Sequence, residues 1–253
     1  MNEPSLLDDS PSWSRLFRHI VQTLARPRLS EEKPFQWRYL RIVLMVLVIS
    51  GFFTMIALVI KVWFDNYFGF DTANEDLVQQ PLLRLMTAGI MAPLVEEIIF
   101  RLPMRLNARN LSVFVAMTLI MFVFGQWVNQ QIAPWVNNQA LEILVRLSVK
   151  LLLAALLAFV FYQVIKNFDP ALVRFRDQRF TLVFYFFTIL FGFAHISNAQ
   201  YSWHNLLYII PLTLPQIISG LFLGYTRIKL GLKYAVLQHA MWNLLLVLPL
   251  FLK

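Results

Sequence analysis

Two neighbouring carboxylates lie inside a stretch whose other residues are typical of a membrane-spanning helix. Glu96 and Glu97 are adjacent, and Arg101 follows Glu97 by four residues. An ionised side chain at membrane depth costs at least about 2.5–3.5 kcal/mol, so such a residue is a functional-site hypothesis by default. Successive helical residues point about 100° apart, so Glu96 and Glu97 face different directions. Glu97 shares a helix face with Arg101 and can neutralise it as an i,i+4 pair. Glu96 is then the carboxylate that is free to face a cavity.

Two histidines and an asparagine lie in later apolar runs. His195 closes the sequence Phe191-Gly-Phe-Ala-His, and His239 precedes Asn243 by four residues. The i,i+4 spacing puts His239 and Asn243 on one helix face. Each of these polar groups has a structural alternative, since His and Asn side chains also hydrogen-bond between membrane helices. Several such groups on three helices of one apolar chain favour a functional site.

The depths of these residues can be compared from the rise of a helix. At about 1.5 Å per residue, Glu96 lies about 20 Å from Arg109 and His195 about 22 Å from Phe180, so both can share one level. His239 lies only about 9 Å above the basic start of its own run on the same rise. Bringing His239 to that level requires a tilted helix, a raised helix start or a funnel-shaped site.

The composition defines the class of protein that must position these side chains. The chain is 58% hydrophobic, against about 45–50% for soluble domains, and its mean hydropathy is +0.61. The net charge of +8 does not indicate nucleic-acid binding, because the basic residues cluster at the ends of apolar runs. The chain has no cysteine, which excludes disulfides, a thiolate nucleophile and a cysteine-based metal site.

The apolar runs predict an all-α, polytopic membrane helix bundle with about seven transmembrane helices, or eight as the alternative. A polar, basic segment, residues 1–38, precedes a transmembrane domain, residues 39–253. We expect spans at 39–64, 81–109, 111–127, 140–165, 180–197, 206–226 and 232–252, with the second kinked at Pro93 and Pro103. We expect an acidic loop with Asp65, Asp71, Glu75 and Asp76, a polar loop at 129–139 and a basic loop at 166–179.

The first 38 residues carry no apolar run typical of a cleavable signal peptide. Residues 13–24 have helical apolar spacing, which predicts an amphipathic helix on the inner leaflet or a mobile, solvated tail. Most of the 22 Lys and Arg residues fall on the inner side if the N-terminus is cytoplasmic, as the positive-inside rule requires. The exceptions are Lys61, Arg84, Arg146, Lys150 and Lys253.

Three short motifs carry a resemblance to a known family. Residues 96–101 match EExxxR, residues 191–195 match FxxxH, and residues 239–243 match HxxxN. Together, and in this order, they resemble the CAAX-protease and bacteriocin-processing (CPBP, or Abi) family of intramembrane proteases, which includes the type II CAAX prenyl endopeptidases. The resemblance covers a core of about residues 81–250. One departure is the pair of apolar spans at about 111–165 that separates the first two motifs.

The resemblance implies a peptide hydrolase of the glutamate type. Glu96 would be the general base that activates a water, and His195 would assist it. His239 and Asn243 would bind the developing oxyanion, since donors fixed on one helix face are preorganised for it. Glu97 and Arg101 would hold the second helix in place.

A metal-dependent variant uses the same residues. Glu96, His195 and His239 could ligate a divalent metal such as zinc, because zinc sites commonly use His and carboxylate ligands. Asn243 is a poor zinc ligand, and the HExxH pattern of zinc proteases is absent from the sequence. We therefore expect no cofactor and keep zinc as the alternative.

The resemblance also implies the setting of the reaction. The partners would be the lipid bilayer and a peptide or protein substrate, either prenylated or otherwise membrane-associated, with no nucleic acid. The motif set and the compact size predict a bacterial inner membrane. Two other functions remain open: a non-catalytic scaffold or regulator, for example in bacteriocin self-immunity, and a transporter with a carboxylate–His relay. The lack of an internal repeat disfavours the transporter.

Overall fold

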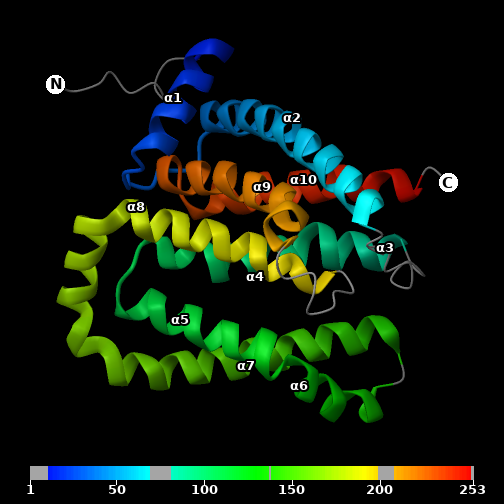
Figure 1. The fold of residues 1–253 in the computed structure, drawn as a ribbon. Coiled ribbons are helices and arrows are strands. Elements are labelled where there is room, and N and C mark those ends of the chain that lie inside the picture. Colours follow the sequence, from blue (N-terminus) through cyan, green and yellow to red (C-terminus); the bar gives the residue numbers. More distant parts are fainter. Residues whose placement is uncertain (1–10, 69–80, 137, 199–207, 252–253) are drawn as a thin grey trace. The chain divides into compact units, whose positions relative to one another are not determined.

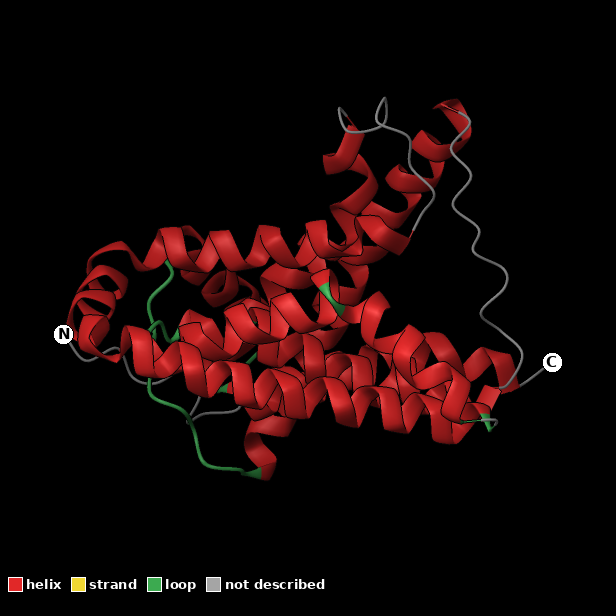
Figure 2. Ribbon diagram, turned by 90° about the horizontal axis from the view of Figure 1, so that it is seen from below, coloured by secondary structure: helices red, strands yellow, loops and turns green. Residues whose placement is uncertain are grey.

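The computed structural model (Figure 1) describes residues 11–68, 81–136, 138–198 and 208–251. Every regular element in these ranges is helical and none is a strand (Figure 2), so the all-α expectation is confirmed. The chain divides into two compact units. The first contains Met1–Glu97 and Phe180–Lys253, and the second contains Ile98–Arg179.

The first unit is a bundle built on the two long helices α2 and α9. Helix α2 packs along α9, and α10 packs against α9, α2 and a π-helical segment that precedes α4 (Figure 1). The elements are α1 (Trp13–Ala25), α2 (Trp37–Phe68), α3 (Pro81–Arg84), the π-helical segment (Leu85–Met91), α4 (Ala92–Phe100), α8 (Asp169–Ala194), a 3-10 turn (His195–Asn198), α9 (Ile209–Lys229), α10 (Leu232–Val247) and a 3-10 turn (Leu248–Phe251). Helices α4 and α8 each pass from one unit into the other.

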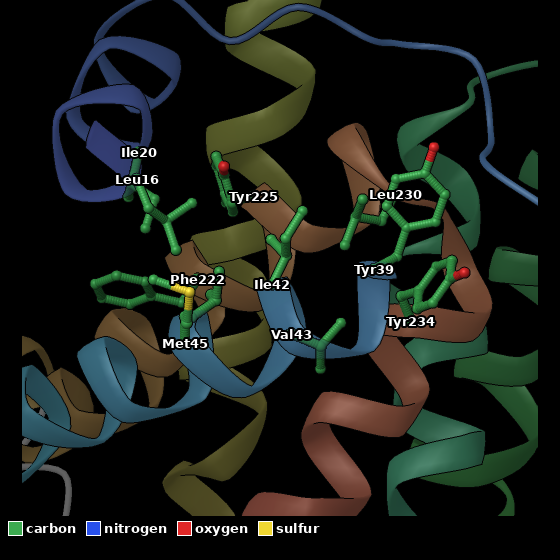
Figure 3. Packing of buried hydrophobic residues seen from close by; sticks show 11 residues of the cluster. Leu16, Ile20, Tyr39, Ile42, Val43, Met45, Phe222, Tyr225, Leu230 and Tyr234 are labelled. Atoms are coloured by element: carbon green, nitrogen blue, oxygen red, sulfur yellow. The ribbon is translucent and has the colours of Figure 1, made fainter. Parts of the chain in front are cut away.

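The core of the first unit lies where α1, α2, α9 and α10 meet (Figure 3). Helix α1 begins after Ser12, whose hydroxyl accepts a hydrogen bond from the Arg15 N–H and caps the helix. It buries Leu16 and Ile20 completely in this core. The amphipathic helix predicted at 13–24 is therefore confirmed, and its apolar stripe is packed rather than mobile. Its position on the inner leaflet stays a prediction.

The second unit is organised around α7, against which α5 and α6 pack. Asn107 and Asn138 accept hydrogen bonds from backbone N–H groups three residues later and cap α5 and α7. The elements are a 3-10 turn (Leu102–Met104), α5 (Ala108–Thr118), a π-helical segment (Leu119–Val123), α6 (Gly125–Ile132), a 3-10 turn (Ala133–Trp135), α7 (Gln139–Ile165), a 3-10 turn (Lys166–Phe168) and the first part of α8.

Three helical stretches among the described residues are long and apolar enough to cross a membrane. They are Trp37–Phe68, the continuous stretch Gln139–Ala194 and Ile209–Lys229. A fourth is obtained if Ala108–Val123 and Gly125–Trp135, which are bent by 61° at their junction, form one broken span. These helices indicate association with a membrane.

The helix predicted from residue 81 to residue 109 is shorter than expected. It ends at Phe100, and Arg101 lies in a turn. Pro103 has no backbone N–H and disfavours helical geometry in the residue before it, which ends the α-helix. A new helix then starts at Ala108 behind the Asn107 cap. The predicted kink at Pro93 corresponds to a change from π-helix to α-helix at residue 92.

The predicted loops at 129–139 and 166–179 are wrong for most of their length. Residues 129–132 continue α6, and α8 begins at Asp169 with Pro170 in its first turn. Proline favours that position because its N–H would have no helical partner there. Within the predicted acidic loop, Asp65 belongs to α2 and pairs with Lys61 at 2.5 Å. Residues 71, 75 and 76 lie outside the described ranges.

Candidate active site

Glu96 and Glu97 are positioned by the junction between the π-helical segment and α4. The Ala92 N–H bonds the Thr87 carbonyl, five residues earlier. Because the two glutamates are adjacent on the α4 helix that follows, they point in different directions. Glu96 lines a cavity, whereas the Glu97 side chain is fully buried.

Glu97 orients His239. The His239 Nδ1 lies 2.9 Å from Glu97 Oε1, and both side chains are almost completely buried. A carboxylate can only accept, so Nδ1 carries the proton and Nε2 is left to face the cavity. The sequence analysis assigned Glu97 to Arg101 and did not find this bond. The sequence carried no signal for it, because the rise per residue put His239 at a different depth from Glu96 and Glu97.

His195 is oriented in the same way by the backbone of its own helix. Its Nδ1 lies 2.8 Å from the Phe191 carbonyl oxygen, which accepts, so Nδ1 is the donor. The Phe191 ring packs against both histidine rings, with centroids 4.8 Å from His195 and 5.7 Å from His239. Both imidazoles are therefore oriented with Nε2 towards the carboxylate of Glu96.

Close helix packing at Gly192 fixes the height of His195. A Cβ at Gly192 would lie 2.3 Å from Ile217 Cγ1 on α9. Only glycine allows α8 and α9 to approach this closely. Because Gly192 is one turn before His195, the same approach holds the imidazole at its place beside α9.

The carboxylate of Glu96 faces both histidines. Its Oε2 lies 3.6 Å from His195 Nε2 and 3.7 Å from His239 Nε2. This oxygen is buried and has no hydrogen-bond partner among the residues that the structure describes. Glu96 and His195 therefore lie side by side, although the continuous helix to Arg109 on which their depths were compared is broken after Phe100. Helix α10 brings the ring of His239 to the same carboxylate.

Asn243 is committed to a backbone carbonyl. Its Nδ2 donates to the Ala88 carbonyl oxygen at 2.8 Å. In the π register set by Ala92 and Thr87, that oxygen would pair with the N–H of residue 93, but Pro93 has none. Asn243 supplies the missing donor and ties α10 to the π-helical segment. One of its two amide hydrogens remains for another acceptor.

A cavity of about 350 Å³ joins these groups within the first unit. Helix α2 contributes Thr54 and α9 contributes Gln216, neither of which the sequence analysis singled out. A polar side chain in an otherwise apolar run was the available signal, but it is weak for Thr. The residues that line the cavity are Thr54, Met55, Leu58, Ala88, Ala92, Glu96, Phe191, His195, Pro215, Gln216, Ser219, His239, Trp242, Asn243 and Leu246.

Arg101 lies in the second unit, as a fully buried side chain in the turn after α4. Its predicted pairing with Glu97 stays a prediction. The structure brings Glu96, Glu97, His195, His239 and Asn243 together in the first unit.

The described residues contain no group of three His, Cys, Asp or Glu side chains arranged to hold a metal ion. The Nδ1–H of His239 donates to Glu97 and the Nδ1–H of His195 donates to the Phe191 carbonyl. A metal ion would therefore have to be ligated by the Nε2 atoms of both histidines. The zinc alternative at Glu96, His195 and His239 remains a prediction for experiment.

Comparisons with models of protein families, with curated proteins and with solved structures find no match to this chain.

Proposed function

We propose that this protein is an intramembrane endopeptidase of the CPBP type that hydrolyses a peptide bond with a water activated by Glu96. One observation carries the proposal. A buried carboxylate oxygen lies 3.6 and 3.7 Å from two oriented imidazole nitrogens at the wall of a cavity. A carboxylate beside two nitrogens that can hold or release protons suits general acid–base catalysis.

In the proposed reaction, Glu96 takes a proton from a water in the cavity. The water's oxygen forms a bond to the substrate carbonyl carbon, and the carbonyl oxygen becomes an oxyanion. His195, held by the Phe191 carbonyl, accepts a hydrogen bond from the second O–H of the water through Nε2, and this hydrogen stays on the attacking oxygen. The C–N bond then breaks, and Glu96 returns its proton to the leaving amine. Atoms and charge balance without a metal or an organic cofactor.

The oxyanion is stabilised by donors on α10. Glu97 accepts the Nδ1–H of His239 and so turns the ring with Nε2 towards the cavity, where this nitrogen donates to the oxyanion when it carries a proton. Asn243 offers its second amide hydrogen while the first stays on Ala88. Such donors are effective because they need no reorganisation during the reaction.

The proposal includes a topology of seven spans with a cytoplasmic N-terminus, in a bacterial inner membrane. The stretch Gln139–Ala194 has 56 residues. At about 1.5 Å per residue it far exceeds a hydrocarbon core of about 30 Å. It therefore has length for two of the predicted spans, with the turn at Lys166–Phe168 and the non-helical residue Arg179 as breaks.

A non-catalytic scaffold is the second candidate, and specific contacts favour it. Asn243 and His239 both hold the π-helical segment and α4 to α10 through hydrogen bonds. A scaffold needs these contacts but does not need Glu96, whose Oε2 makes no such contact with any described residue. The two candidates therefore differ in what they require of Glu96.

The experiment is cleavage of a quenched-fluorescence peptide panel, prenylated and unprenylated, by the detergent-purified protein and by Glu96→Gln. Each is measured with and without a chelator. Cleavage by the wild type alone, unaffected by chelator, is the expected result. Loss of cleavage with the chelator and its rescue by zinc would establish the metal-dependent form of the mechanism. Equal cleavage by Glu96→Gln would overturn the assignment of the base.

A further inference from the structure

The Thr54 hydroxyl behaves differently from other threonine hydroxyls in the same unit. Thr87, Thr188 and Thr213 each donate to the carbonyl one turn earlier, at 2.7–2.8 Å. This is the usual way for a helical threonine to satisfy its hydroxyl in an apolar setting. Thr54 is only 7% exposed, yet within the described part of the chain its Oγ1 has no partner.

Gln216 shows the same feature on the opposite helix. Its Oε1 is buried and unpartnered among the described residues. It follows Pro215, which lies inside α9 and also lines the cavity. A buried amide oxygen or hydroxyl without a hydrogen bond is destabilising, because it has lost its bonds to water and gained none in return. Such groups are therefore expected to have a partner that enters the cavity.

The oxygens of Thr54 and Gln216 line the same cavity as Glu96. The lining contains neither Lys nor Arg. Apart from Glu96 and the two histidines, the groups available for binding are therefore neutral. A neutral hydroxyl and a carboxamide complement the N–H and C=O groups that an extended peptide presents in alternation.

We propose that Thr54 and Gln216 bind the main chain of the substrate peptide and hold the scissile bond over Glu96. Gln216 Oε1 accepts a peptide N–H, and the Thr54 hydroxyl donates to a peptide C=O. The substrate would then be recognised through its extended backbone beside the scissile bond. This inference rests on the proposed endopeptidase function and adds two positioning residues to it.

The test uses the panel peptide that the wild type cleaves fastest, together with copies in which each amide flanking the scissile bond is N-methylated in turn. Gln216→Leu and Thr54→Val are compared with the wild type. Thr213→Val is the matched control for Thr54→Val, because its hydroxyl is already bonded to the Ile209 carbonyl. Thermal unfolding of every variant is recorded beside the kinetics.

We expect Gln216→Leu and Thr54→Val each to raise KM about fivefold, the loss of one net hydrogen bond, with melting temperatures at or above that of the wild type. One of the flanking amides should be the one whose N–H donates to Gln216. N-methylation of that amide should raise the KM of the wild type about fivefold and leave the KM of Gln216→Leu unchanged. Thr213→Val should keep the wild-type KM. It should lower the melting temperature.

Wild-type KM values in both variants would overturn the inference, as would an N-methyl penalty in Gln216→Leu equal to that of the wild type at every position. In both cases a Glu96-dependent cleavage would leave the proposed function standing. If Glu96→Gln cleaves the same peptide as fast as the wild type, the proposed function fails first, and the main-chain inference fails with it.

Discussion

Helix α9 carries buried polar side chains at two places, and they differ in their partners. Near its C-terminal end, the Thr226 hydroxyl donates to Gln238 Oε1, and Arg227 Nη1 donates to Glu32 Oε1 at 2.6 Å. About ten residues earlier, Gln216 Oε1 has no partner among the described residues. One helix therefore contains both a satisfied polar cluster and an unsatisfied one.

The satisfied cluster ties the N-terminal segment to the bundle. The backbone N–H groups of Ser30 and Lys33 donate to the carbonyls of Ile228 and Leu230, and the Gln36 N–H donates to the Tyr234 hydroxyl. We call residues 30–36 the strap. Because buried polar groups are stable only when hydrogen-bonded, the strap end serves stability. The cavity end keeps its polar groups open, which costs stability and suits binding and catalysis.

Glu97→Gln should give the largest effect of the substitutions that sharpen this comparison. The change removes the negative charge that faces the Nδ1–H of His239, so the cleavage rate should fall by about 10²–10⁴-fold. Because Glu97 is fully buried and bonded to His239, the melting temperature of the Glu97→Gln protein should fall as well. Glu97→Asp keeps the charge and is the control. A Glu97→Gln protein with wild-type cleavage would contradict the assigned role of His239.

Gly192→Ala should damage the cavity end through packing. Its Cβ would meet Ile217 Cγ1, and such overpacking costs about 1–3 kcal/mol. We expect a lower melting temperature and slower cleavage, because His195 moves with α8. Adding Ile217→Ala removes the clashing atom and should recover part of both losses. Ile217→Ala alone is measured as well. If the double variant loses more stability and cleavage than the losses of the two single variants added together, this contact does not position His195.

Glu32→Gln should affect the strap end alone. Arg227 is 1% exposed and loses the charge of its partner. We expect a melting temperature lower by about 2–4 °C, the change that 1 kcal/mol produces in a chain of this size, with unchanged cleavage per folded molecule. Glu31→Gln, an exposed neighbour, should leave both unchanged. Equal losses of cleavage in Glu32→Gln and Gly192→Ala would remove the distinction between the two ends.

Pro93→Ala should have the smallest effect. It restores a backbone N–H that competes with Asn243 for the Ala88 carbonyl, so one hydrogen bond is exchanged for another. We expect an unchanged melting temperature and a cleavage rate lower by less than about tenfold. Nuclear magnetic resonance of the Asn243 side-chain amide would report the exchange directly. An amide signal identical to the wild type would contradict this account of the π-helical segment.

The sequence predicts part of this arrangement for physical reasons. Helical spacing identifies α1. The rise per residue put Glu96 and His195 at one level, but that comparison assumed a continuous helix to Arg109, and α4 ends at Phe100. The sequence does not reveal the Glu97–His239 bond, because that contact depends on the packing of α10 against the π-helical segment. The role of Asn243 was also beyond the spacing rules, since the free carbonyl of Ala88 arises from a local π register.

The predicted loops failed for a different reason. Polar composition at 166–179 indicates contact with water, but it does not exclude a helix. The Asp169-Pro170 start was the overlooked signal. Thr54 and Gln216 could be found only from the partners of their oxygens, which no single sequence contains.

The most direct measurement is the cleavage rate and melting temperature of Glu96→Gln beside the wild type, on one peptide and in one detergent. Glu96 Oε2 makes no hydrogen bond to any residue in the described ranges, so its neutral replacement should not lower the melting temperature. The account predicts a rate at least about 10²-fold lower with stability kept or raised. An unchanged rate, or a rate that falls only as the protein unfolds, would contradict it.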